Sequence, residues 1–467
     1  MNDAMIQKAI QEVLSRMKEA EATCACAKGD WGIFEKMDDV IEAADIARQE
    51  YLNRSMTERE KYVQAIRDAV LDKDNLEYMS KMGAEETGIG AYEYKLIKNT
   101  LAAQKTPGTE DLITEAMSGD DGLTLVEYSP FGVIGSITPT TNPTETIICN
   151  SIGMLAAGNA VVFSPHPRAT GVSVFLIQTI NKALAEVGAP ANLVVTVAKP
   201  SIENTEIMMS HPKVRMLVAT GGPAIVQKVL SSGKKAIGAG AGNPPAVVDE
   251  TADIEKAARD IIDGCSFDNN VPCIAEKEVI AVTSIADQLI AEMKKNGAFM
   301  LTDKAQIAQL CELVTKNGKG PKTEFVGKSA LYILDQLGVK APADTRVIIM
   351  EAEEQDVFVQ EELMMPILPI VRVSDVDAAI DMAVRVEHGN RHTAIMHSKN
   401  VDKLTKMAKL IQTTIFVKNG PSYAGIGAGG MGYTTFTIAG PTGEGLTSAK
   451  SFCRRRKCVL VGGMSVR

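Results

Sequence analysis

One cysteine of this sequence stands in a segment where a thiol could act as a nucleophile. Cys273 follows the polar run 268–270 and Pro272, whose nitrogen carries no hydrogen to donate. Backbone N–H groups at the entrance of an ordered element can lower the pKa of a thiol, and the thiolate is the reactive form. A lone cysteine in such a loop can equally be buried and inert. Both interpretations of Cys273 stay open on this segment alone.

A second candidate is an asparagine in a loop behind an expected strand. Asn142 lies in the segment 138–145 (TPTTNPTE), directly after a strand expected at 132–138. Loops at the carboxyl ends of parallel strands carry the ligands of α/β proteins, and a side-chain amide there can donate to a developing oxyanion. An asparagine before proline is also typical of an ordinary Asx turn. The pattern leaves a catalytic and a structural role open.

Two further expected strands end in residues that suit phosphate groups. The strand at 160–164 leads into a Ser-Pro-His-Pro motif, in which His166 either contacts a phosphate or caps a turn. The strand at 216–220 leads into Gly221 and Gly222 at the start of a helix. Backbone N–H groups and the helix dipole at such a start favour a diphosphate.

Other motifs carry less information about chemistry. The glycine-rich run 238–245 (GAGAGNPP) lacks the strand-then-helix setting of a dinucleotide fingerprint, and 425–430 lacks the acidic residue that should follow, so we interpret it as a flexible loop. His388 and His392 are four residues apart, but no HExxH arrangement surrounds them, and we expect no metal site. The sequence contains neither GxxxxGK[ST] nor GxSxG, which argues against P-loop nucleotide hydrolases and α/β-hydrolases.

Bulk properties narrow the class of protein. A chain of 467 residues is longer than one hydrophobic core usually supports, so we expect two large domains. The formal net charge of −9 argues against a nucleic-acid partner, and the dense basic run 454–457 is typical of a solvated face or an interface strand. Eight cysteines without a CxxC pair, no signal peptide and no apolar run near ~20 residues predict reduced thiols, a cytoplasmic location and no membrane span.

The elements that must position these residues alternate between helices and short β-branched strands. Besides the three strands above, the first region has expected helices at 38–52, 57–71, 76–87, 91–103, 147–157, 173–187 and 223–231 and a strand at 193–197. After Asp249 we expect strands at 278–282, 347–350, 369–373 and 414–417 and helices at 253–264, 285–295, 304–316 and 376–386. Such alternation predicts an α/β fold with parallel, doubly wound sheets.

The first residues differ in character from the rest. Apolar residues recur at helical spacing over 1–18, which predicts a short amphipathic helix, and the small and polar residues of 19–32 predict a linker. The apolar stripe of this helix could dock on its own subunit or on a neighbouring one. It could also be an address tag that binds in a groove of another protein.

Taken in order, these segments resemble the aldehyde dehydrogenase superfamily. The matching stretches are TPTTNP, GNAVVFSPHP, VATGG, GAGAGNPP, NNVPC and EELMMP, which begin at 138, 158, 218, 238, 269 and 361. The resemblance implies two Rossmann-like doubly wound domains and a small β element for oligomerisation. It assigns 33–107 and 133–247 to a nicotinamide- and CoA-binding domain, 248–430 to a catalytic domain, and 108–132 with 431–467 to the oligomerisation element, with β-segments at 123–128 and 456–461.

The same resemblance assigns roles to individual residues. Cys273 is implied as the nucleophile, with the Asn142 amide and the Cys273 backbone N–H holding the oxyanion, and Glu362 as the residue that orients the nicotinamide ribose. The residues that it implies along the cofactor cleft are Thr140, Thr141, Ser164, Pro165, His166, Thr220, Gly221, Gly222, Gly240 and Gly242.

Two departures from the hydrolytic members point to one branch of the superfamily. Gly240 stands where those members have the glutamate that activates water, so hydrolysis of a thioester lacks its base, whereas a thiol needs far less help. Ser164 stands where they have a lysine that holds the adenosine ribose. Both features resemble the CoA-acylating branch, in which NAD and coenzyme A occupy overlapping parts of one cleft in turn.

Within that branch, the terminal helix and linker resemble the encapsulation peptides of bacterial microcompartment enzymes that oxidise propionaldehyde or acetaldehyde. The resemblance implies conversion of a short-chain aldehyde, NAD⁺ and coenzyme A to acyl-CoA and NADH. It also implies a homo-oligomer (dimer or tetramer) inside a microcompartment, with a shell or core protein bound to the helix. The alternatives are a hydrolytic aldehyde dehydrogenase, a semialdehyde or acyl-phosphate reductase, and a non-enzymatic shell or scaffold protein.

Overall fold

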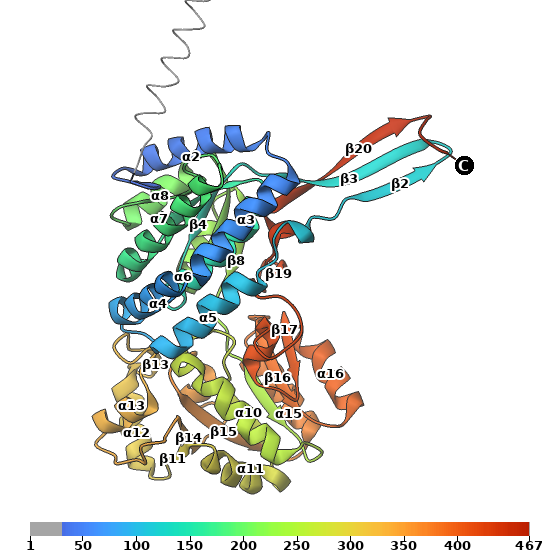
Figure 1. Ribbon diagram of the computed structural model, residues 1–467. Coiled ribbons are helices and arrows are strands. Elements are labelled where there is room, and N and C mark those ends of the chain that lie inside the picture. Colours follow the sequence, from blue (N-terminus) through green and yellow to red (C-terminus); the bar gives the residue numbers. More distant parts are fainter. Residues whose placement is uncertain (1–29, 467) are drawn as a thin grey trace, which may run out of the picture.

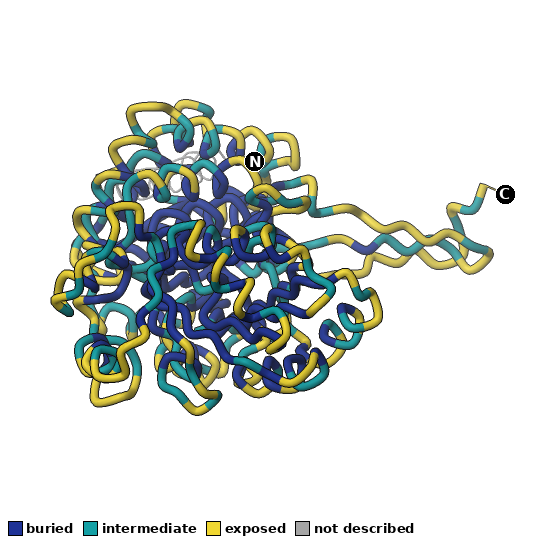
Figure 2. Tube along the Cα trace, turned by 90° about the horizontal axis from the view of Figure 1, so that it is seen from below, coloured by how far each residue is buried: buried dark blue, intermediate teal, exposed yellow. Residues whose placement is uncertain are grey.

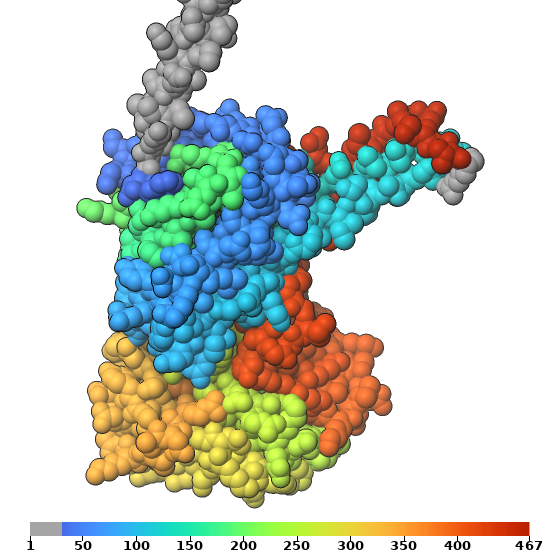
Figure 3. Space-filling model, viewed as in Figure 1, coloured from blue at the N-terminus to red at the C-terminus, as the bar shows by residue number. Residues whose placement is uncertain are grey.

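The computed structural model describes residues 30–466 and shows two bodies, stacked one on the other, with an arm projecting from the first (Figure 1). In the space-filling view the first body rests on the second along a continuous seam (Figure 3). The helix expected at 1–18 and all but the last residues of the linker lie outside the described residues. No helix among residues 30–466 is long and apolar enough to cross a membrane.

The first body is built on a six-stranded sheet in the order β1-β6-β5-β4-β7-β8, and every neighbouring pair is parallel. Its strands are β1 (Ile33–Phe34), β4 (Val133–Ile137), β5 (Ala160–Ser164), β6 (Val194–Val197), β7 (Val214–Thr220) and β8 (Lys235–Ala239). From β4 the chain moves outward to β5 and β6 and then returns to β7 on the other side. Such a reversal opens a crevice at the carboxyl ends of β4 and its neighbours, which is where α/β sheets bind ligands.

Helices cover both faces of this sheet, as a doubly wound fold requires. They are α2 (Met37–Tyr51), α3 (Met56–Leu71), α4 (Lys73–Thr87), α5 (Tyr92–Lys105), α6 (Pro143–Ala156), α7 (Thr170–Glu186), α8 (Ile202–Ser210) and α9 (Pro223–Leu230). Local sequence fixes several ends: Ser55 and Glu58 form a capping box at the start of α3, and Pro143 is the first residue of α6. The sequence did not predict α8, and it started α6 at 147.

The second body is built on a seven-stranded parallel sheet in the order β11-β14-β15-β10-β9-β16-β17. Its strands are β9 (Pro245–Val248), β10 (Glu278–Val282), β11 (Ala298–Met300), β14 (Val347–Glu351), β15 (Ile367–Val373), β16 (Thr393–His397) and β17 (Ile415–Lys418). Its helices are α10 (Ile254–Ser266), α11 (Thr283–Lys295), α12 (Lys304–Val314), α13 (Ala330–Gln336), α14 (Val357–Gln360), α15 (Val376–Val386) and α16 (Val401–Ile411). The expected domain boundary at 247 falls within β9.

The two sheets confirm the predicted α/β class with doubly wound parallel sheets. The predicted elements are present with ends shifted by a few residues, whereas the strands β1, β8, β9, β11 and β16 and the helices α8, α13, α14 and α16 of the two bodies were not predicted. The strand β9 begins at the second of two consecutive prolines, and its four residues are buried, so no alternation of apolar and polar residues marks it.

The arm is an antiparallel sheet of three strands, β2 (Glu115–Gly119), β3 (Gly122–Pro130) and β20 (Cys453–Val461). The β-segments expected at 123–128 and 456–461 are the central parts of β3 and β20. Figure 2 shows that the arm is largely exposed, whereas the two bodies enclose buried cores. The basic run 454–457 lies on β20, where Arg455 pairs with Glu115 across the arm at 2.6 Å.

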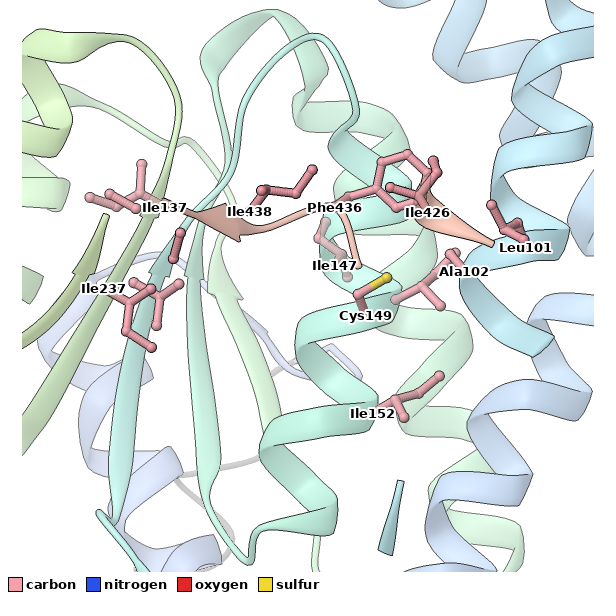
Figure 4. Packing of buried hydrophobic residues seen from close by; sticks show 14 of the residues in the cluster. Leu101, Ala102, Ile137, Ile147, Cys149, Ile152, Ile237, Ile426, Phe436 and Ile438 are labelled. Atoms are coloured by element: carbon pink, nitrogen blue, oxygen red, sulfur yellow. The ribbon is translucent and has the colours of Figure 1, made fainter. Parts of the chain in front are cut away.

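A short segment before the arm strand returns to the first body. It contains β18 (Ile438–Ala439) and β19 (Gly445–Leu446). Phe436 and Ile438 pack against Ile137 and Ile147 of the first body (Figure 4). The resemblance assigns 431–467 as a whole to the oligomerisation element, but this part of it belongs to the core of the first body.

Candidate active site

A cavity of about 710 Å³ lies between the two bodies and is lined by residues of both. All the residues that the sequence suggested for the site line it, although they lie up to 222 positions apart in the chain. They are Thr140, Thr141, Asn142, Ser164, Pro165, His166, Thr220, Gly221, Gly222, Gly240, Gly242, Cys273 and Glu362. The fold therefore brings the predicted nucleophile, the predicted oxyanion donor and the predicted cofactor residues to one cavity.

The loop before Cys273 is tightly turned. The 3₁₀ turn η3 (Phe267–Asn270) includes three consecutive residues, 268–270, with φ between +47° and +64°, a conformation that asparagine and aspartate adopt more readily than other side chains. The Asn270 amide then donates to the carbonyl oxygens of Cys265 at 3.0 Å and Glu276 at 2.9 Å. This asparagine closes the loop around Cys273 and holds the thiol at the cavity wall.

The electrostatic environment of Cys273 differs from the sequence-based expectation. Burial, helped by the negative charge of Glu362, raises the pKa of its thiol to about 12, although the Lys277 ammonium acts in the opposite direction. The prediction of a lowered pKa is wrong for the protein without ligands, because loss of solvation outweighs the nearby N–H groups. The thiol is therefore protonated at neutral pH, and a base must accept its proton during the reaction.

Asn142 is the residue before α6, yet its side chain caps no backbone N–H of that helix. Its Oδ1 atom instead accepts a hydrogen bond from Lys98 Nζ at 2.6 Å, and it is 6 % exposed on the cavity wall. The structure therefore does not place this side chain in the Asx turn that was the alternative. Its amide group is available to a molecule in the cavity.

Several polar groups in the loops after β5 and β7 already make hydrogen bonds within the protein. The Ser164 hydroxyl lies 2.8 Å from that of Thr205, and His166 Nδ1 accepts from the Arg168 backbone N–H at 3.2 Å, which is the turn-capping alternative. The Gly221 N–H donates to the Ala239 carbonyl oxygen at 3.1 Å. It is thus not free for a diphosphate, contrary to the expectation for this group, although Gly221 lines the cavity.

Two glycines of the run between β8 and β9 have different surroundings. A Cβ atom added at Gly240 would meet no atom within 4 Å, so this position faces open space in the cavity. A Cβ atom at Gly242 would lie 2.8 Å from both the Cys273 carbonyl oxygen and His392 Cγ. Gly242 must therefore lack a side chain for the nucleophile loop and His392 to approach, whereas Gly240 leaves room where hydrolytic relatives have a glutamate.

Glu362 has the features of a ligand-binding carboxylate. It accepts a hydrogen bond from the Gly242 backbone N–H, and among residues 30–466 its buried Oε1 atom has no hydrogen-bond partner. Burial raises the pKa of this carboxyl group, while Lys277 and the Gly242 N–H oppose that shift. An unpartnered acceptor at the wall of the cavity suits the hydroxyl groups of a ribose, so the chain's own residues fit a nicotinamide nucleotide.

One histidine of the site was not predicted from the sequence. The spacing of His388 and His392 raised only the question of metal ligands, but His388 Nε2 faces the Gln360 carbonyl oxygen at 3.1 Å, and His392 Nδ1 faces the Thr393 hydroxyl at 2.9 Å. The other ring nitrogen of His392 has no partner within the described chain, and burial lowers the pKa of this side chain to about 4. His392 is therefore a neutral imidazole at neutral pH, and its free nitrogen can accept a hydrogen bond. Within residues 30–466 no three His, Cys, Asp or Glu side chains form a cluster that could hold a metal ion.

Two lysines near the site were also not predicted from the sequence. Lys98 contacts Asn142 from α5, and Lys277 is buried four residues after Cys273, where its Nζ atom donates to the Asn270 carbonyl oxygen at 3.1 Å. No motif in the sequence around either lysine indicates that its charge would be buried. Only the spacing of Lys98 within a helix that is otherwise apolar on one side could have suggested that it faces inward.

Comparison with known proteins agrees with this geometry. Residues 18–447 match the family described as "Aldehyde dehydrogenase family". The chain is 49% identical over 468 residues to a propanal dehydrogenase (CoA-propanoylating) of Salmonella typhimurium, with 100% of both chains covered.

Two solved structures are also similar to it. A propionaldehyde dehydrogenase of Rhodopseudomonas palustris, with bound CoA and an acylated cysteine, has a TM-score of 0.92 and 70% identity, and the match covers 94% of this chain and 100% of that one. A propionaldehyde dehydrogenase from the fucose utilisation microcompartment of Clostridium phytofermentans has a TM-score of 0.91 and 53% identity, with 93% and 100% covered. The chain belongs to the aldehyde dehydrogenase family.

Proposed function

We propose that this protein oxidises a short-chain aldehyde, with NAD⁺ as the hydride acceptor, and transfers the acyl group from Cys273 to coenzyme A. The observation that carries the proposal is the cavity wall at Gly240. It leaves open space beside the nucleophile loop and provides no carboxylate to activate water. The identity to relatives named as CoA-acylating enzymes supports the same reaction.

The first chemical step is attack by the Cys273 sulfur on the aldehyde carbonyl carbon. The thiol proton is relayed to solvent, and His392 Nε2, which also lines the cavity and has no partner among residues 30–466, is a neutral acceptor available for this relay. As the carbon–sulfur bond forms, the carbonyl π electrons move to oxygen. The Asn142 amide and the Cys273 backbone N–H donate hydrogen bonds to that oxyanion. The product is a hemithioacetal on Cys273.

In the second step the oxyanion re-forms the carbonyl and hydride leaves the former aldehyde carbon. When bound, NAD⁺ supplies the hydride acceptor, and Glu362 would hold the hydroxyls of its ribose through the Oε1 atom that has no protein partner among residues 30–466. Ser164, at the position of the family's lysine, provides no cation to hold a 2′-phosphate, which favours NAD⁺ over NADP⁺. The acyl group is then a thioester on Cys273.

The third step is transfer to coenzyme A in the same cavity. The coenzyme A thiol attacks the thioester carbon, the Cys273 sulfur leaves, and the thiol proton of coenzyme A returns to Cys273 through a base. A thiol has a far lower pKa than water, so it needs less help from a base than hydrolysis would. The site at Gly240 therefore favours thiolysis by leaving out the group that hydrolysis requires.

The product formed with and without coenzyme A tests the proposed function. We expect NADH formation from propionaldehyde or acetaldehyde to be multiple-turnover only with coenzyme A present, and to give acyl-CoA by mass spectrometry. Without coenzyme A, at most about one NADH per active site should form. Sustained turnover to the free acid without coenzyme A would establish the hydrolytic alternative instead.

A separate control tests whether Glu362 acts as a base for water, because its negative charge acts on the Cys273 thiol. Replacement of this residue by glutamine should weaken NAD⁺ binding and leave the ratio of acyl-CoA to free acid unchanged. A drop in free acid in the E362Q variant would identify Glu362 as a base for water. The role in ribose binding would then be wrong.

The arm supports assembly with further copies of this chain. Its C-terminal strand carries exposed apolar side chains, with Val459, Leu460 and Val461 49–82% exposed. Exposed apolar edges of this kind pair with another chain in homo-oligomers. Truncation after residue 452 should reduce a dimer or tetramer to a smaller species in light scattering, and an unchanged mass would contradict the arm's role.

The proposed location, inside a bacterial microcompartment, rests on the N-terminal residues of the chain. The solved relative from a microcompartment and the apolar periodicity of 1–18 support encapsulation through that segment. Residues 1–18 fused to a fluorescent protein should co-localise with microcompartment shell proteins expressed in the same cell. Replacement of Ile10 and Leu14 by glutamate removes the apolar stripe and should give diffuse fluorescence. Diffuse fluorescence of the unmodified fusion would contradict the proposal.

A further inference from the structure

Two buried lysines lie one helical turn apart on α5, the helix that runs along the boundary of the two bodies (Figure 1). Lys95 and Lys98 are 1% and 0% exposed. Lys98 Nζ lies 2.6 Å from Asp268 Oδ2 and 2.9 Å from Glu145 Oε1, and Lys95 Nζ lies 3.3 Å from the same Asp268 oxygen. The cluster therefore contains two ammonium groups and two carboxylates, and its formal charges cancel.

Stability alone does not account for such a cluster. Burial removes four charged groups from water, and exchange of buried ion pairs for apolar residues of similar size is often neutral or stabilising. Lys98 nevertheless stays charged: burial opposes its ionisation, but the two carboxylates outweigh burial and hold its pKa above the usual range, whereas burial lowers the pKa of Lys95. A buried network of this kind fixes geometry, because each member satisfies a directional contact of another.

The cluster connects the two loops that carry the chemistry. Asp268 belongs to the turn that precedes Cys273, and it also accepts the Ala91 backbone N–H at 2.8 Å. On the other side, Lys95 Nζ donates to the Thr141 carbonyl oxygen at 2.9 Å, and Lys98 Nζ donates to Asn142 Oδ1 at 2.6 Å. One face of α5 thus joins the nucleophile loop of the second body to the oxyanion loop of the first.

The contact with Asn142 has a consequence for catalysis. A carboxamide has an acceptor end and a donor end of nearly the same shape, and its neighbours decide which way it points. An ammonium group can only donate, so the atom that faces Lys98 must be Oδ1. The NH₂ group of Asn142 is therefore turned away from Lys98; it makes one long contact, 3.5 Å to the Thr141 hydroxyl, which leaves its second hydrogen for another acceptor.

We propose that Lys98 is a positioning residue that fixes the Asn142 carboxamide with its NH₂ group toward the carbonyl oxygen of the substrate. The inference rests on the proposed role of Asn142 as an oxyanion donor. Without a donor-only neighbour, the carboxamide could turn its oxygen toward the developing negative charge, which would repel that charge instead of stabilising it. The lysine thus acts on the transition state without touching the substrate.

The test removes Lys98 while keeping the buried cluster neutral. The variant Lys98→Met/Glu145→Gln removes one positive and one negative charge and leaves the Lys95–Asp268 pair in place. We expect kcat to fall roughly 10²-fold, toward the value of Asn142→Ala, since one oxyanion donor is worth about 10²–10³ in kcat. NADH affinity, measured by fluorescence titration, should stay the same, because the cluster does not line the nucleotide cleft.

A double-mutant cycle separates positioning from a general structural effect. When Lys98→Met/Glu145→Gln is added to Asn142→Ala, we expect no further fall in kcat, because the donor that Lys98 positions is already gone. The matched control is Lys95→Met/Glu145→Gln, which is equally buried, equally charge-balanced and retains the contact between Lys98 and Asn142. It should lose less activity than the Lys98 variant at a comparable thermal unfolding temperature.

The outcomes distinguish this inference from the proposed function. If kcat falls by the same factor with and without Asn142, Lys98 acts by another route and the inference is overturned. If Asn142→Ala itself retains full kcat, the proposed oxyanion role fails instead. Should the methionine variant not fold, Lys98→Gln/Glu145→Gln replaces it, because a glutamine can donate or accept and so no longer fixes the carboxamide; the same non-additive result is expected, and additivity again contradicts the inference.

Discussion

The two bodies present opposite ends of their parallel sheets to the same cavity. In the first body the site residues follow the strands: 138–142 come after β4, 164–167 after β5 and 220–222 after β7. In the second body they precede the strands: Cys273 comes before β10, Glu362 before β15 and His392 before β16. Glu278, the first residue of β10, pairs with Pro245, the first residue of β9, so these two strands begin side by side.

This difference divides the chemistry between the bodies. The first body follows the usual rule that ligands bind at the carboxyl ends of strands, and it provides the cofactor loops and the oxyanion amide. The second body provides the proposed nucleophile, a neutral histidine and the proposed ribose-binding carboxylate from loops that lead into its sheet. The reacting groups therefore meet only when the two sheets face each other, and α5 connects the two sides.

The largest effect should come from the nucleophile of the second body. Cys273→Ala should abolish NADH formation, because no other group at the cavity can form the thioester, while nucleotide binding persists. Cys265→Ala is the matched control, since this thiol lies on the same segment but is fully buried and accepts from the Asn270 amide at 3.3 Å. Steady-state rates and NADH titrations measure both, and retained turnover in Cys273→Ala would refute the assignment.

Next comes the contribution of the first body to the oxyanion. Asn142→Ala should lower kcat by about 10²–10³-fold, or roughly 2.7–4 kcal/mol of transition-state stabilisation, with little change in the KM for aldehyde. A rise in KM at constant kcat would contradict a role of Asn142 in stabilising the oxyanion. Asn142 would then bind the substrate in its ground state.

The raised pKa of Cys273 predicts how the free protein reacts with iodoacetamide. Only the thiolate reacts, so a pKa of about 12 means that its fraction rises about tenfold for each pH unit through the neutral range. The rate of alkylation at Cys273, followed by mass spectrometry of its peptide, should thus keep rising between about pH 7 and 10. A plateau near pH 8 would show that the neighbouring cations outweigh burial.

The smallest effect should come from restoring a carboxylate at the junction of the two bodies. A Cβ atom at Gly240 meets no atom within 4 Å, so Gly240→Glu should fold and place a base in the cavity. We expect a slow formation of free acid that the unmodified protein lacks, together with slower acyl-CoA formation. Chromatography of the products measures both, and Gly240→Gln controls for the added bulk. Equal acid formation by the glutamine variant would exclude general-base catalysis by the new side chain.

Much of the site could be predicted from the sequence because its motifs are local. Cys273 and Asn142 each stand in a short segment whose residue types already suggest the chemistry, and the absence of an acid at Gly240 can be observed in the sequence itself. The alternation of helices and strands likewise predicts parallel doubly wound sheets. These features depend on residues that are close together in the sequence, so they can be recognised without a structure.

Which ends of the second sheet face the cavity depends on long-range packing, and this arrangement places His392 at the site. The tertiary structure alone showed that burial raises the pKa of Cys273, that Gly221 uses its N–H within the protein, and that Phe436 packs into the first body. Lys98 and Asn142 are 44 positions apart, and nothing in either segment predicts their contact. The sequence indicates the candidate reacting groups, because their residue types and motifs are local, whereas their orientation and protonation depend on long-range packing and desolvation.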